Sequence, residues 1–367
     1  MTRGSLLCYN SPKRGDRMDI INDVSVWEKL KNTNEPIIMY GTGNGADKVM
    51  DILENKSIRL SGITASSTFV RNRSFRGFPV MPLSHFEETL GNFTVIVTFG
   101  TQIPEVMENI YNIAKKHRVL VPCVPVIGTK AFDKSFALEN AEKIEKAYNL
   151  LADDFSKEIY RGYVNFLYGG ELDTLKKITT AEDEAFLNIL KLSENETYID
   201  IGAYRGDTVD TFLEYSKGSY NKIICAEPDT KTYNKLMNHC ENLNNFKAFN
   251  AAVTDTDGVV GFSNVHGRQS ALGGDKPTKS VSLGTLCENA EPTYIKIDSE
   301  GCEYAILKGG SDILVKYTPK LNVAAYHKSE DIFELPILIN SINPAYKIHL
   351  RHHPYIPAWD TLFYCTN

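Results

Sequence analysis

Short apolar runs alternate with amphipathic stretches along the first third of the chain, a pattern typical of a parallel α/β domain. The run at 37–40 predicts a buried strand, followed by a glycine turn and the helical pattern ADKVMDILENK. Further strands are predicted at 58–63, 77–80, 94–98 and 119–121, and a helix at 104–117. We therefore predict a small α/β domain over residues 35–130, preceded by an extension and lead-in segment at 1–34.

The pattern changes to a purely helical one after residue 131. Over 138–160, one face of the predicted helix gathers Ile144, Ala147, Tyr148, Leu151 and Phe155. The region up to about residue 191 continues this spacing, with a break at Gly169-Gly170. It predicts a helical linker or cap over residues 131–194.

A second alternation of strands and helices begins at Thr197 and predicts a larger domain over 195–367. Its strands are predicted at 197–201, 222–226, 246–253, 294–297 and 321–326, with helices at 207–216, 230–242, 302–309 and 331–341. The last two strands, 346–350 and 361–365, are joined by a proline-rich loop with no helix between them. Such a short connection predicts an antiparallel hairpin that closes a mostly parallel sheet.

Composition narrows the class of protein. The chain has 367 residues, of which 42% are hydrophobic and 23% charged, with a net charge of -6. No long basic block occurs, which disfavours a nucleic-acid partner. The apolar runs are far shorter than the roughly 20 residues of a membrane span. We expect a globular protein of two domains.

Seven cysteines without a C-x-x-C pair predict reduced thiols in a cytoplasmic protein and no structural zinc site. The segment 1–17 is polar and basic and has no apolar stretch long enough for a secretory signal. Two interpretations stay open: a disordered extension, or a natural start at Met18.

Residues 198–208, YIDIGAYRGDT, place a strand, an acid and a glycine turn in succession. Ligands of open parallel sheets bind at this edge. The turn lacks the lysine of a phosphate-binding loop and does not fit G-x-G-x-x-G. Asp200 could pair with a cationic amino-acid group, and Gly202 allows close approach of the backbone. Glu227 ends the next strand, where an acid can accept hydrogen bonds from both ribose hydroxyls. An adenosine with a short charged tail, such as S-adenosylmethionine, fits these features.

From about residue 195 to 365 the chain resembles the FkbM family of S-adenosylmethionine-dependent methyltransferases. The resemblance rests on YIDIGAYRGDT, AEPD at 226–229, NAAV at 250–253, IKIDSEGCE at 295–303, LKGG at 307–310, AYHKSED at 325–331, ELP at 334–336, YKIHLRH at 346–352 and WDTLFY at 359–364. Two residues depart from it: Tyr204, where the family often has Asn, and Gly284, where it often has Asp.

The resemblance implies a Rossmann-like class I methyltransferase sheet of seven strands, preceded by the smaller α/β domain and the helical linker. It also implies O-methylation of a sugar or polyketide-type hydroxyl, with S-adenosylhomocysteine as the product, as in polysaccharide biosynthesis. The residues expected to contact the cofactor are Asp200, Gly202, Ala203, Tyr204, Gly206, Asp207, Thr208, Glu227, Pro228, Asp229, Ala252 and Asp298. Asp207 and Thr208 have a simpler alternative role as helix caps.

Three residues are candidates for catalysis. Asp298 ends the strand YIKID and His327 follows the strand LNVAAY, so both belong to the sheet edge of Asp200. Either is a candidate general base, because transfer to a hydroxyl requires loss of its proton. Glu300 follows Asp298 as a third candidate. The alternatives are helix capping for the two acids and loop attachment for His327. Gln269 and Ser270 lie in a glycine-rich stretch interpreted as a loop over the ligand or a surface turn.

His349, His352 and His353 alternate along a strand and so point to opposite faces, which predicts structural histidines rather than a metal site. We predict no essential metal.

The glycine turn of the first domain contains Gly41, Gly43, Asn44 and Gly45. The next strand, in RLSGITASS, has no terminal acid, so NAD is not supported. With Lys48-Val49 and GFPV at 77–80, the segment resembles the Rossmann-like nucleotide-sugar-binding domain of sugar acyltransferases. A domain used only for docking or dimerisation is the alternative.

The leading hypothesis is therefore an S-adenosylmethionine-dependent O-methyltransferase that acts on a sugar, glycoconjugate or related small-molecule acceptor. A cofactor-binding scaffold without turnover and an NAD-dependent oxidoreductase are the rivals. The oligomeric state, including a homo-oligomer, stays open.

Overall fold

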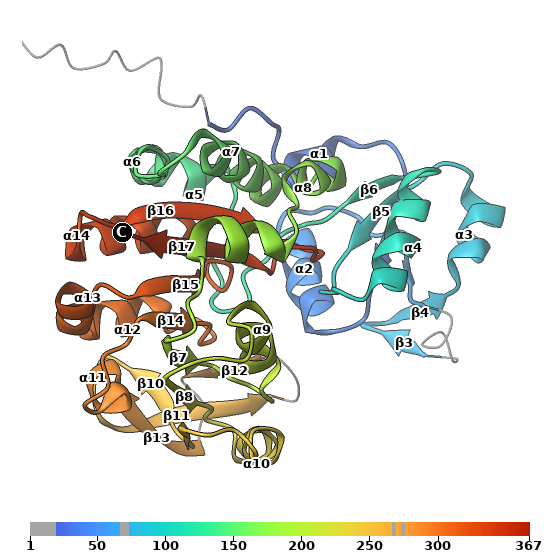
Figure 1. Ribbon diagram of the computed structural model, residues 1–367. Helices are drawn as coiled ribbons and strands as arrows, with labels where there is room; N and C mark the ends of the chain where they lie inside the picture. Colours follow the sequence, from blue (N-terminus) through green and yellow to red (C-terminus); the bar gives the residue numbers. More distant parts are fainter. Residues whose placement is uncertain (1–19, 67–72, 266–268, 273–275) are drawn as a thin grey trace, which may run out of the picture.

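The computed structural model describes residues 20–66, 73–265, 269–272 and 276–367, in two α/β lobes joined by a layer of helices (Figure 1). The predictions of a disordered segment 1–17 and of a start at Met18 lie outside the described residues. Among the described residues, no helix has the length and apolar character needed to cross a bilayer.

The first lobe contains a six-stranded sheet in the order β3-β4-β2-β1-β5-β6. Its strands are β1 (Ile37–Tyr40), β2 (Gly62–Thr64), β3 (Ser74–Phe75), β4 (Phe78–Met81), β5 (Thr94–Val97) and β6 (Arg118–Leu120), and its helices are α1 (Val26–Asn32), α2 (Asn44–Asn55), α3 (Leu83–Leu90) and α4 (Pro104–Ala114). All strand pairs are parallel except β3 with β4. The strand order reverses between β1 and β5, so their carboxyl ends flank the crevice where such sheets bind ligands.

The helical layer contains α5 (Lys134–Glu139), α6 (Ala141–Asn149), α7 (Asp154–Gly169), α8 (Leu172–Ile178) and the π-helix η2 (Glu184–Leu190). The predicted continuous face over 138–160 is wrong at its end. Asp153 caps α7 by accepting a hydrogen bond from the Ser156 amide, which starts a new helix and leaves Phe155 43% exposed. The predicted break is confirmed, because Gly170 ends α7 in the left-handed conformation.

The second lobe contains a seven-stranded sheet in the order β16-β17-β15-β14-β7-β8-β9. Its strands are β7 (Thr197–Ile201), β8 (Lys222–Ala226), β9 (Phe246–Phe249), β14 (Tyr294–Ile297), β15 (Lys320–Ala324), β16 (Lys347–His352) and β17 (Thr361–Thr366), and its helices are α9 (Asp207–Tyr215), α10 (Thr230–His239), α12 (Glu303–Gly309), α13 (Ser311–Tyr317) and α14 (Asp331–Ile342). The hairpin β16–β17 is antiparallel, which confirms the predicted closure. The order reverses between β7 and β14.

A separate four-stranded sheet interrupts the second lobe: β10 (Ala252–Thr254), β11 (Gly258–Val265), β12 (Gln269–Leu272) and β13 (Lys276–Ser282), followed by α11 (Leu283–Cys287). The single strand predicted at 246–253 is therefore two strands in two sheets. Between them, the Asn250 side chain donates to the carbonyls of Glu227 and Pro228, at 2.9 and 3.1 Å. Gln269 and Ser270 lie in a strand rather than the predicted loop, because they pair with β11.

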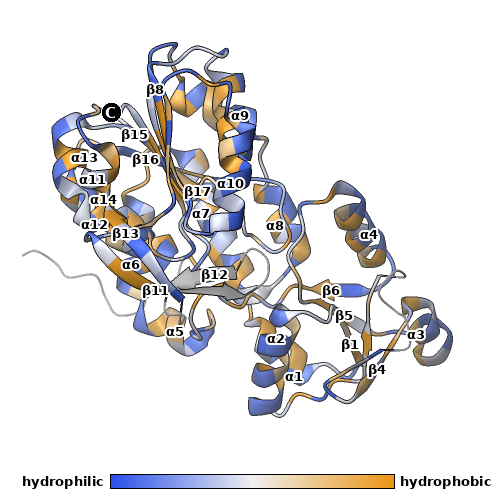
Figure 2. Ribbon diagram, turned by 90° about the horizontal axis from the view of Figure 1, so that it is seen from below, coloured by the Kyte–Doolittle hydropathy of each residue, from blue (hydrophilic) through white to orange (hydrophobic). Residues whose placement is uncertain are grey.

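The helical layer bonds to both sheets. Glu171 bridges to Leu120 of β6, while Leu151 and Thr179 bridge to Ile348 and His352 of β16. Helices of both lobes show an apolar face and a polar face (Figure 2), as expected for helices packed on a sheet. The two carboxyl edges are thereby held toward a common junction.

Candidate active site

A cavity of about 610 Å³ opens at the carboxyl edge of the seven-stranded sheet. Its lining includes Glu227, after β8, and Asp298, after β14, which lie on the two sides of the point where the strand order reverses. It thus lies at the β7–β14 reversal, where open α/β sheets bind their ligands. A second hollow of about 570 Å³ lies at the opposite edge, beside Asn195 and Asn221, away from the glycine turn.

The glycine turn after β7 packs directly against the end of β14. Gly202 has a φ of +80°, and a Cβ there would come within 1.8 Å of the Asp298 carbonyl oxygen. Tyr204 and Gly206 also have positive φ, at 46° and 100°. Only glycine fits the first of these positions, so Gly202 lets the two strand ends meet beneath the cavity.

Glu227, at the end of β8, is 7% exposed and lines the cavity. Its carboxylate accepts hydrogen bonds from the amides of Tyr204, at 3.1 Å, and Asp229, at 2.8 Å. Burial raises the pKa of Glu227 to about 7, although these two amides oppose the rise. Each oxygen keeps lone-pair capacity toward the cavity, as a ribose diol requires.

We expect S-adenosylhomocysteine to bind about fivefold to tenfold more tightly at pH 8 than at pH 6, because the ionised form of Glu227 is the better acceptor and becomes populated through pH 7. Calorimetric titration at both pH values measures the change. Glu227→Gln, which does not ionise, is the control and should bind weakly at both. Equal affinities for the wild-type protein at the two pH values would contradict a ribose contact through Glu227.

Asp200 does not face the cavity as the sequence suggested. Its side chain is fully buried, accepts a hydrogen bond from Thr208 Oγ1 at 2.5 Å, and lies 3.3 Å from Nζ of Lys296. Lys296 also donates to the Gly202 carbonyl at 2.9 Å. Burial lowers the pKa of Lys296, but the nearby carboxylates of Asp200 and Asp298 outweigh this effect and raise it. Asp200 therefore acts on the turn through Lys296 and not by direct contact with a ligand.

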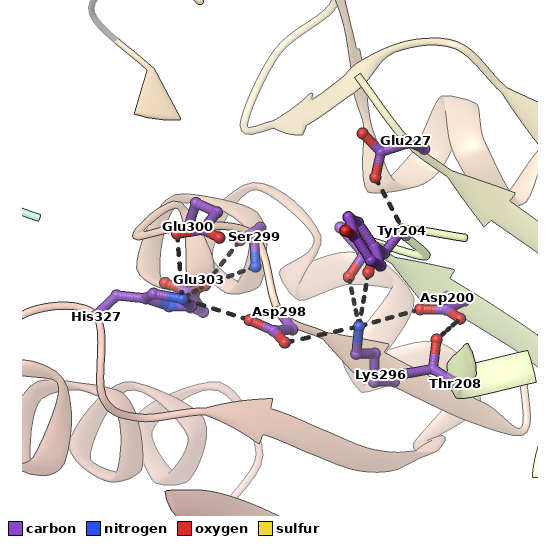
Figure 3. A network of polar contacts seen from close by, with 12 residues as sticks. Asp200, Tyr204, Thr208, Glu227, Lys296, Asp298, Ser299, Glu300, Glu303 and His327 are labelled. Carbon is purple, nitrogen blue, oxygen red and sulfur yellow. Dashed lines mark hydrogen bonds and ion pairs between the residues drawn. The ribbon is translucent and has the colours of Figure 1, made fainter. Parts of the chain in front are cut away.

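Asp298 follows β14 and His327 follows β15, and their side chains lie together (Figure 3). Asp298 lines the cavity, is partly exposed, and accepts a hydrogen bond from the Tyr326 hydroxyl at 3.0 Å. His327 is 1% exposed, and its Nε2 lies 3.4 Å from Asp298 Oδ1 and 3.7 Å from Glu300 Oε2. Asp298 can reach a bound molecule, whereas His327 lies behind it.

The His327 imidazole is paired with Glu303, a fully buried carboxylate. The Nδ1···Oε1 distance is 3.0 Å, in an ion pair without well-directed hydrogen-bond geometry. Burial lowers the pKa of His327, but Glu303, Asp298 and Glu300 raise it to about 10. A histidine that already carries its proton at neutral pH cannot accept another, which argues against His327 as the general base.

Most of the predicted cofactor residues line the cavity: Gly202, Tyr204, Asp207, Thr208, Glu227, Pro228, Asp229, Ala252 and Asp298, with Glu300 beside them. Asp200, Ala203, Gly206 and His327 do not. Sequence reasoning missed Lys296, Tyr326, Tyr355, Trp359, Glu182 and Gln102. Lys296 could have been found, because a lysine within a strand predicted to be buried is unusual. Gln102 carries no local signal, because it comes from the other lobe.

The three histidines near the end of the chain have separate structural partners. His349 pairs with Asp153 at 2.7 Å, and His353 contacts the Tyr364 hydroxyl at 2.7 Å. His352 is buried, which lowers its pKa to about 3. Among the described residues, Asp298, Glu303 and His327 form a group whose ligand atoms lie within 4.8 Å of one another. The His327 imidazolium supplies a cation to that group; the absence of an essential metal stays a prediction.

The glycine turn of the first lobe has packing reasons for two of its glycines. A Cβ on Gly41 would come within 2.6 Å of Thr98 Oγ1, and one on Gly45 within 2.3 Å of the Thr98 carbonyl oxygen. Gly43 faces open space, while Lys48 donates to the carbonyls of Pro125 and Val126. Nucleotide-sugar binding at Gly41, Gly43, Asn44 and Gly45 therefore stays a prediction.

Comparisons with known proteins agree with this geometry. Residues 200–355 match the family model described as the methyltransferase FkbM domain, and no curated protein matches the chain. A methyltransferase FkbM from Methylobacillus flagellatus KT has a TM-score of 0.71 at 20% identity, over 95% of each chain. Its fold is therefore shared over nearly the whole length.

Two further solved structures each match about half of the chain. Fibrillarin from Aeropyrum pernix, with natively bound S-adenosyl-L-methionine, has a TM-score of 0.32 at 11% identity, over 48% of this chain and 69% of that one. Precorrin-6y C5,15-methyltransferase from Geobacter metallireducens GS-15 has a TM-score of 0.33 at 11% identity, over 52% and 90%. The family model confirms the predicted cofactor, S-adenosylmethionine, and the Gly202 turn and Glu227 fit it.

Proposed function

We propose that this chain, an S-adenosylmethionine-dependent methyltransferase whose residues 200–355 form an FkbM domain, methylates a hydroxyl of a sugar, glycoconjugate or related small molecule. The observation that carries the proposal is the Asp298 carboxylate, which lines the cavity and is oriented by Tyr326. A carboxylate in that position suits the removal of a hydroxyl proton.

S-adenosylmethionine, when bound, supplies an electrophilic methyl group on a sulfonium centre. In the mechanism we infer, Glu227 accepts hydrogen bonds from the ribose hydroxyls and fixes the adenosine end of the cavity. Asp298 takes the acceptor's proton as the oxygen attacks, while the Tyr326 hydroxyl holds Oδ1 in place. His327 balances the charge of Glu303 and Glu300 behind it, so Glu300 is assigned to charge balance rather than to proton removal.

The part of the cavity around Asp298, Tyr355 and Trp359 is the end where the acceptor would bind, and its lining supports a sugar. The rings of Tyr355 and Trp359 lie with centroids 6.0 Å apart and both line the cavity, together with the acidic residues Glu182 and Asp360. Aromatic faces suit the apolar C–H face of a sugar ring, and carboxylates accept hydrogen bonds from its hydroxyls. This pairing of apolar rings with acids also suits the role in polysaccharide biosynthesis that the sequence suggested.

A nucleotide-sugar is a second candidate for the acceptor. Strand β5, at the crevice between β1 and β5, continues into the loop whose Gly100 packs on Trp359, a residue of the cavity lining. A nucleotide held at that crevice would place its sugar at the acceptor end. We infer a cytoplasmic location, since the described cysteines, Cys123, Cys225, Cys240, Cys287, Cys302 and Cys365, are all free thiols.

We expect the protein to release S-adenosylhomocysteine with at least one member of a panel of methyl glycosides and nucleotide-sugars, and the product to carry an O-methyl group by mass spectrometry and NMR. Binding of S-adenosylhomocysteine without turnover of any panel member would favour a scaffold. A methylated nitrogen or carbon in the product would contradict O-methylation. A nicotinamide titration that shows tight binding would revive the oxidoreductase hypothesis.

A further inference from the structure

The loop after β5, residues 98–103, connects the first lobe to the methyltransferase cavity. Thr101 and Ile356, from the loop between β16 and β17, exchange two backbone hydrogen bonds, of 2.7 and 2.9 Å. Both residues are buried, at 6% and 0% exposure. This short antiparallel bridge fixes the loop of the first lobe beside the cavity.

The contact continues along the loop through close packing. A Cβ on Gly100 would come within 2.3 Å of the Trp359 ring and 3.2 Å of the Tyr355 ring. Gly100 therefore lets the backbone of the first lobe lie directly on the two aromatic rings of the acceptor end. The position of the Tyr355 and Trp359 rings therefore depends on this contact with the first lobe.

The residue after this bridge, Gln102, is exposed and lines the same cavity as Asp298, Tyr326 and Trp359. The glutamine amide both donates and accepts hydrogen bonds, as does a sugar hydroxyl. Glu182, just before the π-helix η2, adds a carboxylate to the lining from the helical layer. Three parts of the chain thus meet at one end of the cavity.

We propose that the acceptor binds at the junction of the two lobes and that Gln102, from the first lobe, is a specificity-determining residue that hydrogen-bonds a sugar hydroxyl above the Tyr355–Trp359 pair. The inference rests on the proposed function and adds a role for the first lobe: it completes the acceptor site. The cofactor end, around Glu227, is formed by the second lobe alone among its described lining residues.

The chain offers a built-in probe for binding. It contains two tryptophans, Trp27 and Trp359, and Trp27 is buried in the core of the first lobe. In a Trp27→Phe background, tryptophan emission therefore reports on Trp359 alone. UDP-glucose, UDP-N-acetylglucosamine, GDP-mannose and the methyl glycosides of the same sugars are titrated against this protein with S-adenosylhomocysteine present, and each is also assayed for methyl transfer with S-adenosylmethionine.

For the sugar compound that binds, Gln102→Ala should raise both the dissociation constant and the KM about tenfold, as expected for one lost hydrogen bond to a ligand. The affinity for S-adenosylhomocysteine and the kcat should stay close to wild type. Glu105→Ala, on an exposed residue three positions along that does not line the cavity, is the matched control and should change neither.

Each outcome separates the inference from the proposed function. A sugar compound that wild type and Gln102→Ala methylate with the same KM would overturn the junction site and leave O-methylation standing. A panel in which S-adenosylhomocysteine binds but no sugar shifts Trp359 emission or is methylated would overturn the sugar class, and the inference with it. Gly100→Ala provides a second variant. The added methyl group must displace Trp359, so the affinity for the same sugar compound should fall.

Discussion

Asp298→Asn is expected to lower the rate of methyl transfer about 10²- to 10⁴-fold, the range typical of losing a general base. The change keeps the size of the side chain and an oxygen that can accept the Tyr326 hydrogen bond, which spans 3.0 Å in the wild-type protein. It removes the capacity to take a proton from the acceptor, together with the negative charge that faces Lys296 and His327. The affinity for S-adenosylhomocysteine should stay close to wild type, because Glu227, at the other end of the cavity, is untouched.

The measurement is the single-turnover rate with the acceptor identified from the sugar panel, alongside calorimetry with S-adenosylhomocysteine. Glu300→Gln is the matched control, since Glu300 lines the same cavity two residues away and also lies against His327. Its effect on the rate should be far smaller than that of Asp298→Asn. If both variants retain wild-type rates, proton removal is carried by another group or by solvent, and the mechanism proposed for Asp298 fails.

The sequence was a good guide to the elements of the seven-stranded sheet and to the edge at which its strands end. The strands of the seven-stranded sheet, the helices α9, α10, α12 and α14, the closing hairpin and the place of Glu227 and Asp298 at one sheet edge were predicted from it, because a parallel sheet gathers its strand ends at one edge. The four-stranded sheet β10-β13-β11-β12 was not, because its pairings are set by contacts between strands and not by local spacing.

The sequence was a poor guide to which polar side chains face the cavity. Asp200 and Asp298 both end strands of the same sheet, yet Asp200 is fully buried against Lys296 while Asp298 is partly exposed. The difference depends on Lys296, whose ammonium needs carboxylate partners once it is buried. Gln102 was beyond reach for another reason: it enters the cavity from a different sheet, more than 190 residues before Asp298 in the chain.

His327→Gln is expected to lower the free energy of unfolding by about 3–5 kcal/mol, the cost of removing one partner from a buried ion pair. The variant leaves the Glu303 carboxylate, which is fully buried, without its cation. Urea denaturation near pH 6.5 measures the change. His349→Gln is the matched control, since His349 pairs with Asp153, a carboxylate with 37% exposure, and such a pair contributes about 0–1 kcal/mol.

The pH dependence gives a second signature of the same pair. The folded-state pKa of His327 is raised to about 10, above the 6.5 of the unfolded chain, so its stabilisation is complete below pH 6.5 and is lost as the pH rises toward 10. Asp331 lies in the same cluster, where burial and Glu303 raise its pKa to about 7, so the comparison uses the difference between wild type and variant at each pH. That difference should shrink between pH 6.5 and 10. The double variant His327→Gln/Glu303→Gln should recover much of the lost stability, because no unpaired buried charge remains.

These measurements also decide between the two general bases that the sequence left open. If His327→Gln loses stability as described but still transfers methyl groups under conditions in which it is folded, His327 is the structural cation behind Asp298. A His327→Gln protein as stable as His349→Gln that transfers methyl groups orders of magnitude more slowly would reverse the assignment. The imidazole would then be neutral in the working enzyme, and Glu303 would orient it as a base, as a buried carboxylate does for a catalytic histidine.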